Sequence, residues 1–228
     1  MSRLAIIALA TTATAALPAL AETKTYNVQD FDGLEVSAGI KAIYETGTAT
    51  SVEVENRDGD FSDIIVEVDD GDLILKRPRK MGWGNRTPYT VTIGVQSLED
   101  VKASSGSSVK GNGLAGDDAS IDVSSGAHVA ITNIAAGEIE IETSSGSSVE
   151  ASGTCNELEA DASSGSEIRA EKLQCASVTA DVSSGASIRA YATDSVNGDA
   201  SSGGSIRVAG GAKNVTKDQS SGGSVSVK

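Results

Sequence analysis

The tripeptide Ser-Ser-Gly recurs through the C-terminal half of the chain at a nearly constant interval. Its glycines follow one another every 18 to 20 residues, at Gly106, Gly126, Gly146, Gly165, Gly185, Gly203 and Gly222. A short motif that returns at such a period is typical of repeat architectures, in which each copy folds into the same unit. This repeat constrains the fold more than any other feature.

Apolar residues flank each Ser-Ser-Gly at spacings of two. Five residues after the first serine, every copy carries a β-branched aliphatic residue: Val109, Val129, Val149, Ile168, Ile188, Ile206 and Val225. Five residues before it, every copy but the first is apolar. Alternate residues share one face of a strand, and glycine permits the positive φ of a tight bend. We therefore expect strands on both sides of a serine–glycine corner, with one face turned inward.

Copies of this length could form hairpins or the coils of a solenoid. An array of hairpins would need a large core, yet only 3% of the residues are aromatic. Stacked coils place like residues above one another around a narrow aliphatic core. The sequence therefore predicts an all-β fold, a parallel β-helix or β-solenoid with coils of about 20 residues, three short strands per coil and about 4.8 Å between coils.

Residues 22–100 have β character without an obvious repeat. Asp70-Gly71 lies between two β-prone segments, which is a hairpin signal. We expect this portion to cap or extend the column. The chain is thus divided into a signal peptide (1–21), a non-repetitive β portion (22–100) and Ser-Ser-Gly repeats (101–228), the last two forming one continuous domain.

The N-terminus has the features of an export signal. Arg3 precedes the apolar run Leu4 to Leu9, and Ala19-Leu20-Ala21 supplies small residues for cleavage near Ala21. No second apolar stretch follows, so we expect a secreted or periplasmic protein of the bacterial cell envelope with no transmembrane anchor.

The chain is acidic, with a net charge of −14 and a pI of about 4.4. Phosphates would be repelled, so nucleic acid is excluded as a partner. We interpret the negative net charge as a feature that keeps the protein soluble. The alternative is that it serves to bind cations.

The two cysteines, Cys155 and Cys175, are one repeat apart and share the same phase. Stacked coils would bring their Cα atoms within the range that a disulfide accepts. Because exported proteins meet an oxidising environment, we predict a disulfide between adjacent coils, with two stacked free thiols as the alternative.

Three features together resemble a known bacterial family. They are the segment Phe31-Asp32-Gly33-Leu34-Glu35-Val36-Ser37-Ala38-Gly39-Ile40, the turn and strand Asp70-Gly71-Asp72-Leu73-Ile74, and the seven corners. They resemble the putative auto-transporter adhesin, head GIN domain family (DUF2807), over nearly the whole exported chain. The resemblance implies an adhesive or surface role.

An acidic residue stands two positions before the serines in six copies: Asp122, Glu142, Asp161, Asp181, Asp199 and Asp218. Stacking would place these like charges about 4.8 Å apart, and Ca²⁺ could offset their repulsion. The alternative is a solvated strand face. Asp161, Asp181 and Asp199 are the candidate metal ligands, and no other cofactor is expected.

Two groups of basic residues interrupt the acidic chain. Lys110, Arg169, Arg189 and Arg207 form a partial stripe six residues after the first serine, read as a solubility device or a polyanion-binding wall. Arg77, Arg79, Lys80 and Arg86 surround the only tryptophan, Trp83. Such a segment could stack on a sugar or contact an envelope surface, so these five residues are the candidate ligand-binding site. The alternative is a long loop that folds back on the column.

No catalytic constellation emerges from the sequence. Asp161, Asp181, Arg169 and Arg189 could imitate the acidic and basic cluster of a polysaccharide-active β-helix enzyme, but they recur in phase with the repeat. We therefore predict a non-catalytic, adhesin-like or envelope-associated binding or structural module, whose partner is a cell-surface glycan or envelope protein. A polysaccharide-active enzyme or a calcium-dependent carbohydrate-binding protein is the alternative. The sequence does not indicate the oligomeric state.

Overall fold

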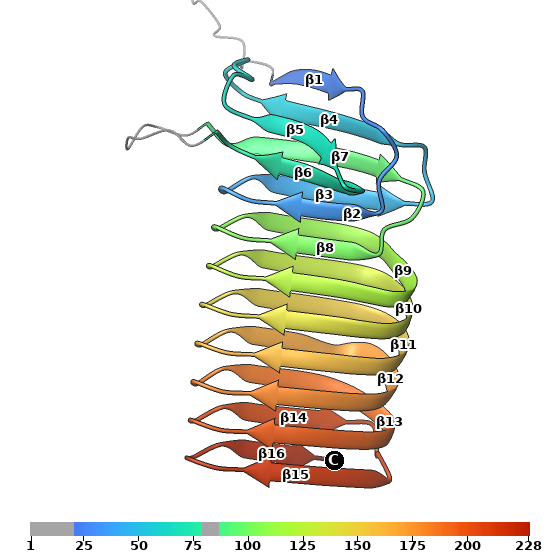
Figure 1. Ribbon diagram of the computed structural model, residues 1–228, viewed down its shortest axis with the longest axis vertical. Coiled ribbons are helices and arrows are strands. Elements are labelled where there is room, and N and C mark those ends of the chain that lie inside the picture. Colours follow the sequence, from blue (N-terminus) through green and yellow to red (C-terminus); the bar gives the residue numbers. More distant parts are fainter. Residues whose placement is uncertain (1–20, 79–86) are drawn as a thin grey trace, which may run out of the picture.

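The computed structural model describes residues 21–78 and 87–228 as a column of stacked β-strands (Figure 1). The N-terminal part comprises β1 (Glu22–Tyr26), β2 (Gly33–Val36), β3 (Lys41–Thr46), β4 (Ser51–Asn56), β5 (Ile65–Asp69), β6 (Asp72–Lys76) and β7 (Tyr89–Val95). The repeats comprise β8 (Asp100–Ala103), β9 (Ser108–Val123), β10 (His128–Thr143), β11 (Ser148–Ala162), β12 (Glu167–Val182), β13 (Ser187–Ala200), β14 (Ser205–Ala209), β15 (Asn214–Gln219) and β16 (Ser224–Val227).

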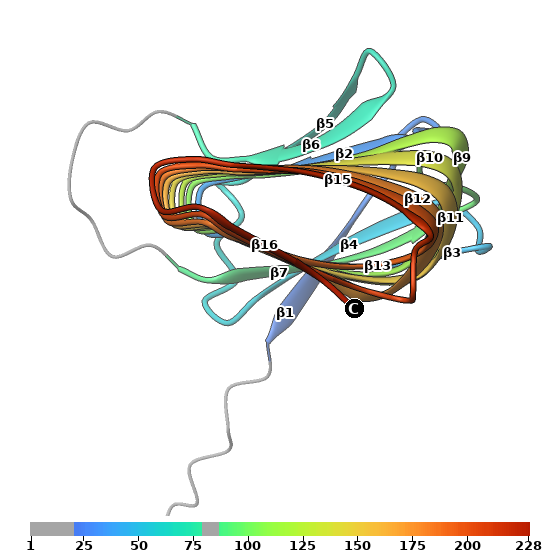
Figure 2. The ribbon, with the colours of Figure 1, turned by 90° about the horizontal axis from the view of Figure 1, so that it is seen from below.

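The repeats form the predicted β-solenoid. Strands β9 to β13 pair in parallel with their neighbours, one strand per coil. Each is 14 to 16 residues long and bends around the side opposite the serine corners, as the view along the column shows (Figure 2). The expected three short strands are therefore replaced by one continuous strand, because backbone pairing between coils continues through the bend.

The serine corners are tight turns that hydrogen-bond to one another. In the corner at 104–107, Ser105 has φ 54° and Gly106 has φ 71°. The Ser107 amide donates to the Ser104 carbonyl at 3.1 Å, which closes a four-residue turn. The Gly106 amide donates to the carbonyl of Ser125 in the next corner, also at 3.1 Å. The corners thus continue the backbone ladder along the edge of the column.

The predicted inward rows form the core, except in the last coil, where Val215 of the row that precedes the corners is 42% exposed because no further coil of the described chain covers it. Six members of the aliphatic row that follows the corners have no exposed surface, and the seventh, Val225, is 8% exposed. The serine that follows some corner glycines is also buried, and its hydroxyl bonds to backbone. Ser107 Oγ donates to the Val36 carbonyl at 2.9 Å, and Ser147 Oγ donates to the Val123 carbonyl at 2.7 Å. These serines are structural.

The N-terminal part both extends and caps the column. Strands β2 and β3 are joined by Ser37–Ile40, where Ala38 and Gly39 have φ of 59° and 74°, as in the serine corners. This coil pairs in parallel with β6 and β7 on one side and with β8 and β9 on the other. Beyond it, β4 pairs antiparallel with β7, and β1 pairs antiparallel with β4. In the described ranges no helix is long and apolar enough to span a bilayer.

Candidate functional site

The acidic residues that precede the corners form one continuous row on the column. Pairing places Asp122, Glu142, Asp161, Asp181, Asp199 and Asp218 beside one another in successive coils. Five of them, from Asp122 to Asp199, line an open groove of about 460 Å³ together with corner serines. The predicted ladder of carboxylates is therefore present, and its spacing is that of the backbone stack.

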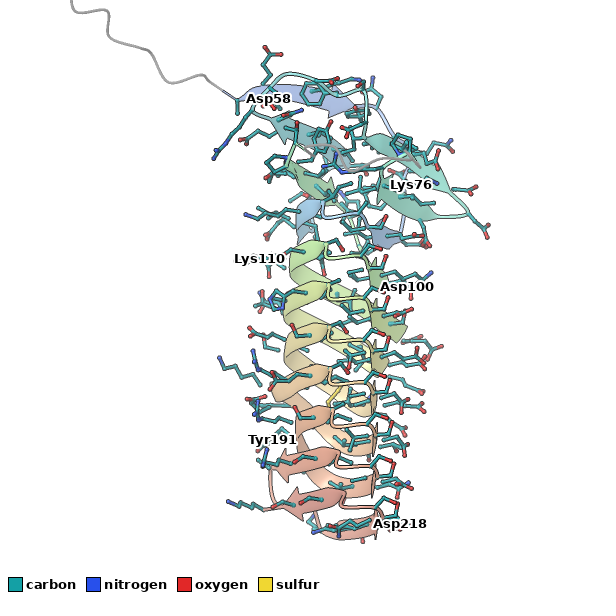
Figure 3. The ribbon with its side chains drawn as sticks, turned by 90° about the vertical axis from the view of Figure 1, so that its left-hand side faces the viewer. Asp58, Lys76, Asp100, Lys110, Tyr191 and Asp218 are labelled. Carbon is teal, nitrogen blue, oxygen red and sulfur yellow. A yellow bond between two sulfur atoms is a disulfide. The ribbon has the colours of Figure 1, made fainter. Side chains whose placement is uncertain are left out.

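Further carboxylates surround this row. The outward side chains of the strand segments before the corners form a surface that we call the acidic wall. Its carboxylates are Asp100, Asp118, Asp122, Glu138, Glu140, Glu142, Glu157, Glu159, Asp161, Asp181, Asp199 and Asp218. In Figure 3, Asp100 and Asp218 lie on one side of the column, and Lys110 and Tyr191 lie on the other.

Burial and neighbouring negative charges raise the pKa values of the carboxylates at the centre of the acidic wall. Burial raises the pKa of Asp161 to about 6, and the charges of Asp181, Glu159, Glu142 and Glu140 add to the effect. Burial, followed by the charge of Asp199, also raises the pKa of Asp181. Ionised carboxylates at this centre therefore oppose folding near neutral pH.

The carboxylates do not converge. Within residues 21–78 and 87–228 no group of three or more His, Cys, Asp or Glu side chains is arranged to hold a metal ion. The row members project side by side from successive coils, whereas Ca²⁺ takes six to eight oxygens from several directions. Ca²⁺ binding by Asp161, Asp181 and Asp199 stays a prediction of the sequence.

Asp161→Asn is expected to stabilise the protein in a pH-dependent manner. The raised pKa means that ionised Asp161 costs stability above about pH 6, and this cost disappears as the pH falls toward the ordinary value of 3.8. Because the side chain is only half-buried, we expect a gain of about 1 kcal/mol after screening, or about 2–4 °C in Tm, near pH 8. Thermal melts at about pH 8 and pH 3.5 measure it, with exposed Glu53→Gln as the matched control. An equal gain at both pH values would contradict the assignment.

The opposite side of the column carries basic residues, and we call it the arginine wall. It consists of the outward side chains that follow the corners, and its cations are Lys110, Arg169, Lys172, Arg189, Arg207 and Lys228. Pairing aligns Arg169, Arg189 and Arg207 in three successive coils. The basic stripe seen in the sequence is thus a continuous row over this part of the wall.

Ion pairs join two of the three arginines in this row to the neighbouring Glu150 and Glu167. Arg169 contacts Glu150 at 2.7 Å and Glu167 at 2.5 Å, and Arg189 contacts Glu167 at 2.5 Å. Burial would raise the pKa of Glu167, but hydrogen bonds and charge from Arg169 and Arg189 outweigh it and lower that pKa. Arg207 forms no ion pair with any described residue.

Two hollows indent the arginine wall, and the sequence pattern did not reveal them. One of about 230 Å³ has Ala130, Ile131 and Ala151 in its lining, together with Arg169 and Lys172. The other, of about 250 Å³, includes Ala190, Val208 and Ala209 in its lining, together with Arg189, Arg207 and Lys228. Glu171 lines both.

The first hollow lies where the repeat shortens. The register shifts between Ile131 and Ile134 on one side of β11, and between Glu150 and Ser152 on the other. Gly153 then approaches the preceding coil so closely that a Cβ atom there would lie 2.1 Å from the Ile134 carbonyl oxygen. The 19-residue interval was visible in the sequence, but the place within the coil where the register shifts was not.

Only one of the five predicted loop residues can be placed. Arg77 follows β6, and its side chain is 7% exposed. It contacts Asp63 at 2.6 Å, donates to the carbonyls of Ala38 and Thr87, and lies 4.7 Å from the centre of the Tyr89 ring. Arg79, Lys80, Trp83 and Arg86 lie outside the described residues, so ligand binding by them stays a prediction.

The predicted disulfide is present. Cys155 and Cys175 occupy paired positions in β11 and β12, with their Cα atoms 4.6 Å apart, and they are bonded. The bond closes a separation of 20 residues and links two adjacent coils.

Comparisons with known proteins agree with this architecture. A family model described as "Putative auto-transporter adhesin, head GIN domain" matches residues 30–212. A comparison with curated proteins finds no match.

Solved structures share the fold. A putative adhesin from Bacteroides fragilis is 19% identical with a TM-score of 0.84, covering 92% of this chain and 97% of its own. A putative lipid binding protein from Parabacteroides distasonis and a putative adhesin from Parabacteroides merdae are each 17% identical with a TM-score of 0.68. In both cases 91% of this chain and 96% of the other chain are covered. At these identities the matches establish the fold alone.

Proposed function

The chain belongs to the family of putative auto-transporter adhesin head GIN domains, and from this premise we propose that it is a non-catalytic, adhesin-like binding module of the bacterial cell envelope. The observation that carries the proposal is the column itself, whose two long walls repeat the same kind of side chain in successive coils. Such a surface suits an extended ligand that contacts several coils at once.

The position of the charged residues argues against the enzyme alternative. Asp161 and Asp181 belong to the acidic wall, whereas Arg169 and Arg189 belong to the arginine wall on the other side of the column. The aliphatic core separates the two walls. These four residues therefore cannot act on one scissile bond, which removes the cluster that a polysaccharide-active β-helix would need.

The disulfide supports a location outside the cytoplasm, because such bonds persist in oxidising compartments. We propose a secreted or periplasmic protein, released from a signal peptide near Ala21. The partner is a cell-surface glycan or an envelope protein.

Binding without turnover is the expected result of a direct test. Residues 22–228 are applied to an array of neutral and acidic glycans and to isolated envelope fractions, and soluble polysaccharides are assayed for newly released reducing ends. We expect retention on at least one surface and no release of reducing ends. Turnover of any polysaccharide would refute the non-catalytic proposal.

The same array tests the loop predicted from the sequence. The double variant Trp83→Ala with Arg79→Ala loses binding if that loop carries the ligand. Unchanged binding would remove the loop from the proposed site and leave the walls of the solenoid.

A further inference from the structure

The charge of the protein is divided between its two walls. The acidic wall contains most of the carboxylates of the repeats. Lys102 is a described cation on this wall. On the arginine wall the cations outnumber the glutamates, which are Glu150, Glu167 and Glu171. The whole chain nevertheless has a net charge of −14. The acidity is therefore not a uniform solubility coat, and an anion meets a favourable surface on one side only.

The guanidinium groups on the favourable side are regularly placed. Arg169, Arg189 and Arg207 occupy paired positions in three successive coils, so their backbones are about 4.8 Å apart. The ion pairs with Glu150 and Glu167 hold the first two, whose side chains remain 41% and 38% exposed. A guanidinium has five N–H donors, so each retains donors for a carboxylate from outside.

Apolar surface lies beside these charges. The linings of the two hollows include apolar residues next to the arginines. Ala130 and Ala209 are accessible there, whereas Ala151, Ala190 and Val208 lie at the base and are nearly fully buried. Their combination of small aliphatic side chains and planar cations matches a ring that has a C–H face and a carboxylate at its edge. A uronic acid residue in a polysaccharide has this form.

We infer that the arginine wall binds an extended acidic polysaccharide that lies along the column axis. Sugar rings occupy the hollows, and their carboxylates accept hydrogen bonds from Arg189 and Arg207. Arg169 also donates to a carboxylate of the ligand, which replaces Glu150 as its partner. A β-1,4-linked chain turns over at each sugar, so its carboxylates on one side recur at roughly twice the spacing of the coils. Each carboxylate that faces the wall then lies within reach of the arginines of two adjacent coils. The inference rests on the proposed binding function and names its ligand class.

The test uses residues 22–228 with an oligomer of about eight β-1,4-linked mannuronate residues as the probe and a β-1,4-linked mannose oligomer of the same length as the neutral comparison. Titration calorimetry gives the affinities. We expect the acidic oligomer to bind, the neutral one to bind at least about tenfold more weakly, and the difference to shrink as NaCl is raised from about 0.05 to 0.5 M.

Two double variants locate the site. Arg189→Ala with Arg207→Ala is expected to lower affinity for the acidic oligomer at least about tenfold, because two charge-assisted contacts are lost. Lys76→Ala with Lys102→Ala removes the same charge from exposed ion pairs away from the arginine wall and is expected to change affinity less than about twofold. The substitution Arg189→Lys with Arg207→Lys separates charge from bidentate geometry and should restore binding only in part. Thermal melts verify that all variants fold.

The outcomes separate this inference from the proposed function. Equal binding of the neutral oligomer, an equal loss in both alanine pairs, or loss only in Trp83→Ala with Arg79→Ala would overturn the arginine wall as an acidic-polysaccharide site. Binding to phosphatidylglycerol vesicles without binding to the oligomer would overturn it in favour of a membrane surface. If the Arg189 and Arg207 alanine pair still binds other array glycans, the inference fails while the envelope-binding function stands.

Discussion

Arg77→Ala is expected to lower the free energy of unfolding by about 3 kcal/mol, because it removes one partner of a largely buried ion pair. Asp63 would lose its contact with Arg77 at 2.6 Å, and the carbonyls of Ala38 and Thr87 would lose a donor. The guanidinium joins the end of β6, the corner between β2 and β3, and the segment that leads into β7. Its loss therefore loosens three parts of the N-terminal portion at once.

A thermal melt measures this effect as a decrease in Tm of about 6–12 °C. The adjacent Lys76 provides a matched control, since its ion pair with Glu67 joins side chains that are 40% and 47% exposed. Lys76→Ala should change stability by less than about 1 kcal/mol. Arg77→Ala with Asp63→Asn should recover part of the loss, because the remaining buried group is then neutral.

The same variant discriminates between two roles of Arg77. The sequence grouped it with the ligand-binding residues around Trp83, whereas its contacts in the structure are internal. If Arg77→Ala were as stable as the wild type and lost glycan binding, the ligand-binding role would be correct and the structural role wrong.

Removal of the disulfide is the second change with a large expected effect. Closing a loop of 20 residues restricts the unfolded chain and stabilises the fold by about 3 kcal/mol in the loop-entropy model. Cys155→Ala with Cys175→Ala should therefore lower Tm by about 6–12 °C.

The repeat itself makes this double variant a clean one. Cys155 is paired with Ala136 and Cys175 with Ala192 in the adjoining coils, so alanine is already the residue at this position. Treatment of the wild type with a reductant should give the same lower Tm, and the variant should not respond to it. An unchanged Tm after complete reduction, verified by thiol titration, would show that the bond does not stabilise the column.

The repeats were largely predictable because each coil carries the same local information. The serine corners set a period, the aliphatic rows set the inward face, and stacking turned both into a core. The acidic row, the basic stripe and the paired cysteines followed from the same phase. The candidate surfaces of the protein could thus be recognised from single positions counted from the serines.

The N-terminal portion was less predictable because its contacts do not follow chain order. The coil of β2 and β3 lies between the coil of β6 and β7 and the coil of β8 and β9. Its corner at Ser37–Ile40 has the backbone of a serine corner but only part of the motif. A single degenerate copy, about 70 residues from the next corner, has no period that would reveal it.

The sequence by itself determined the β-solenoid, its inward rows, its cystine and the two charged rows, because a repeat of fixed phase stacks like residues on like. Only the tertiary structure decided that the aliphatic core separates the two charged rows, where the shortened coil opens a hollow, and that Arg77 lies inside an ion pair. These properties depend on distances between segments that lie far apart in the chain, and those distances arise only when the coils pack.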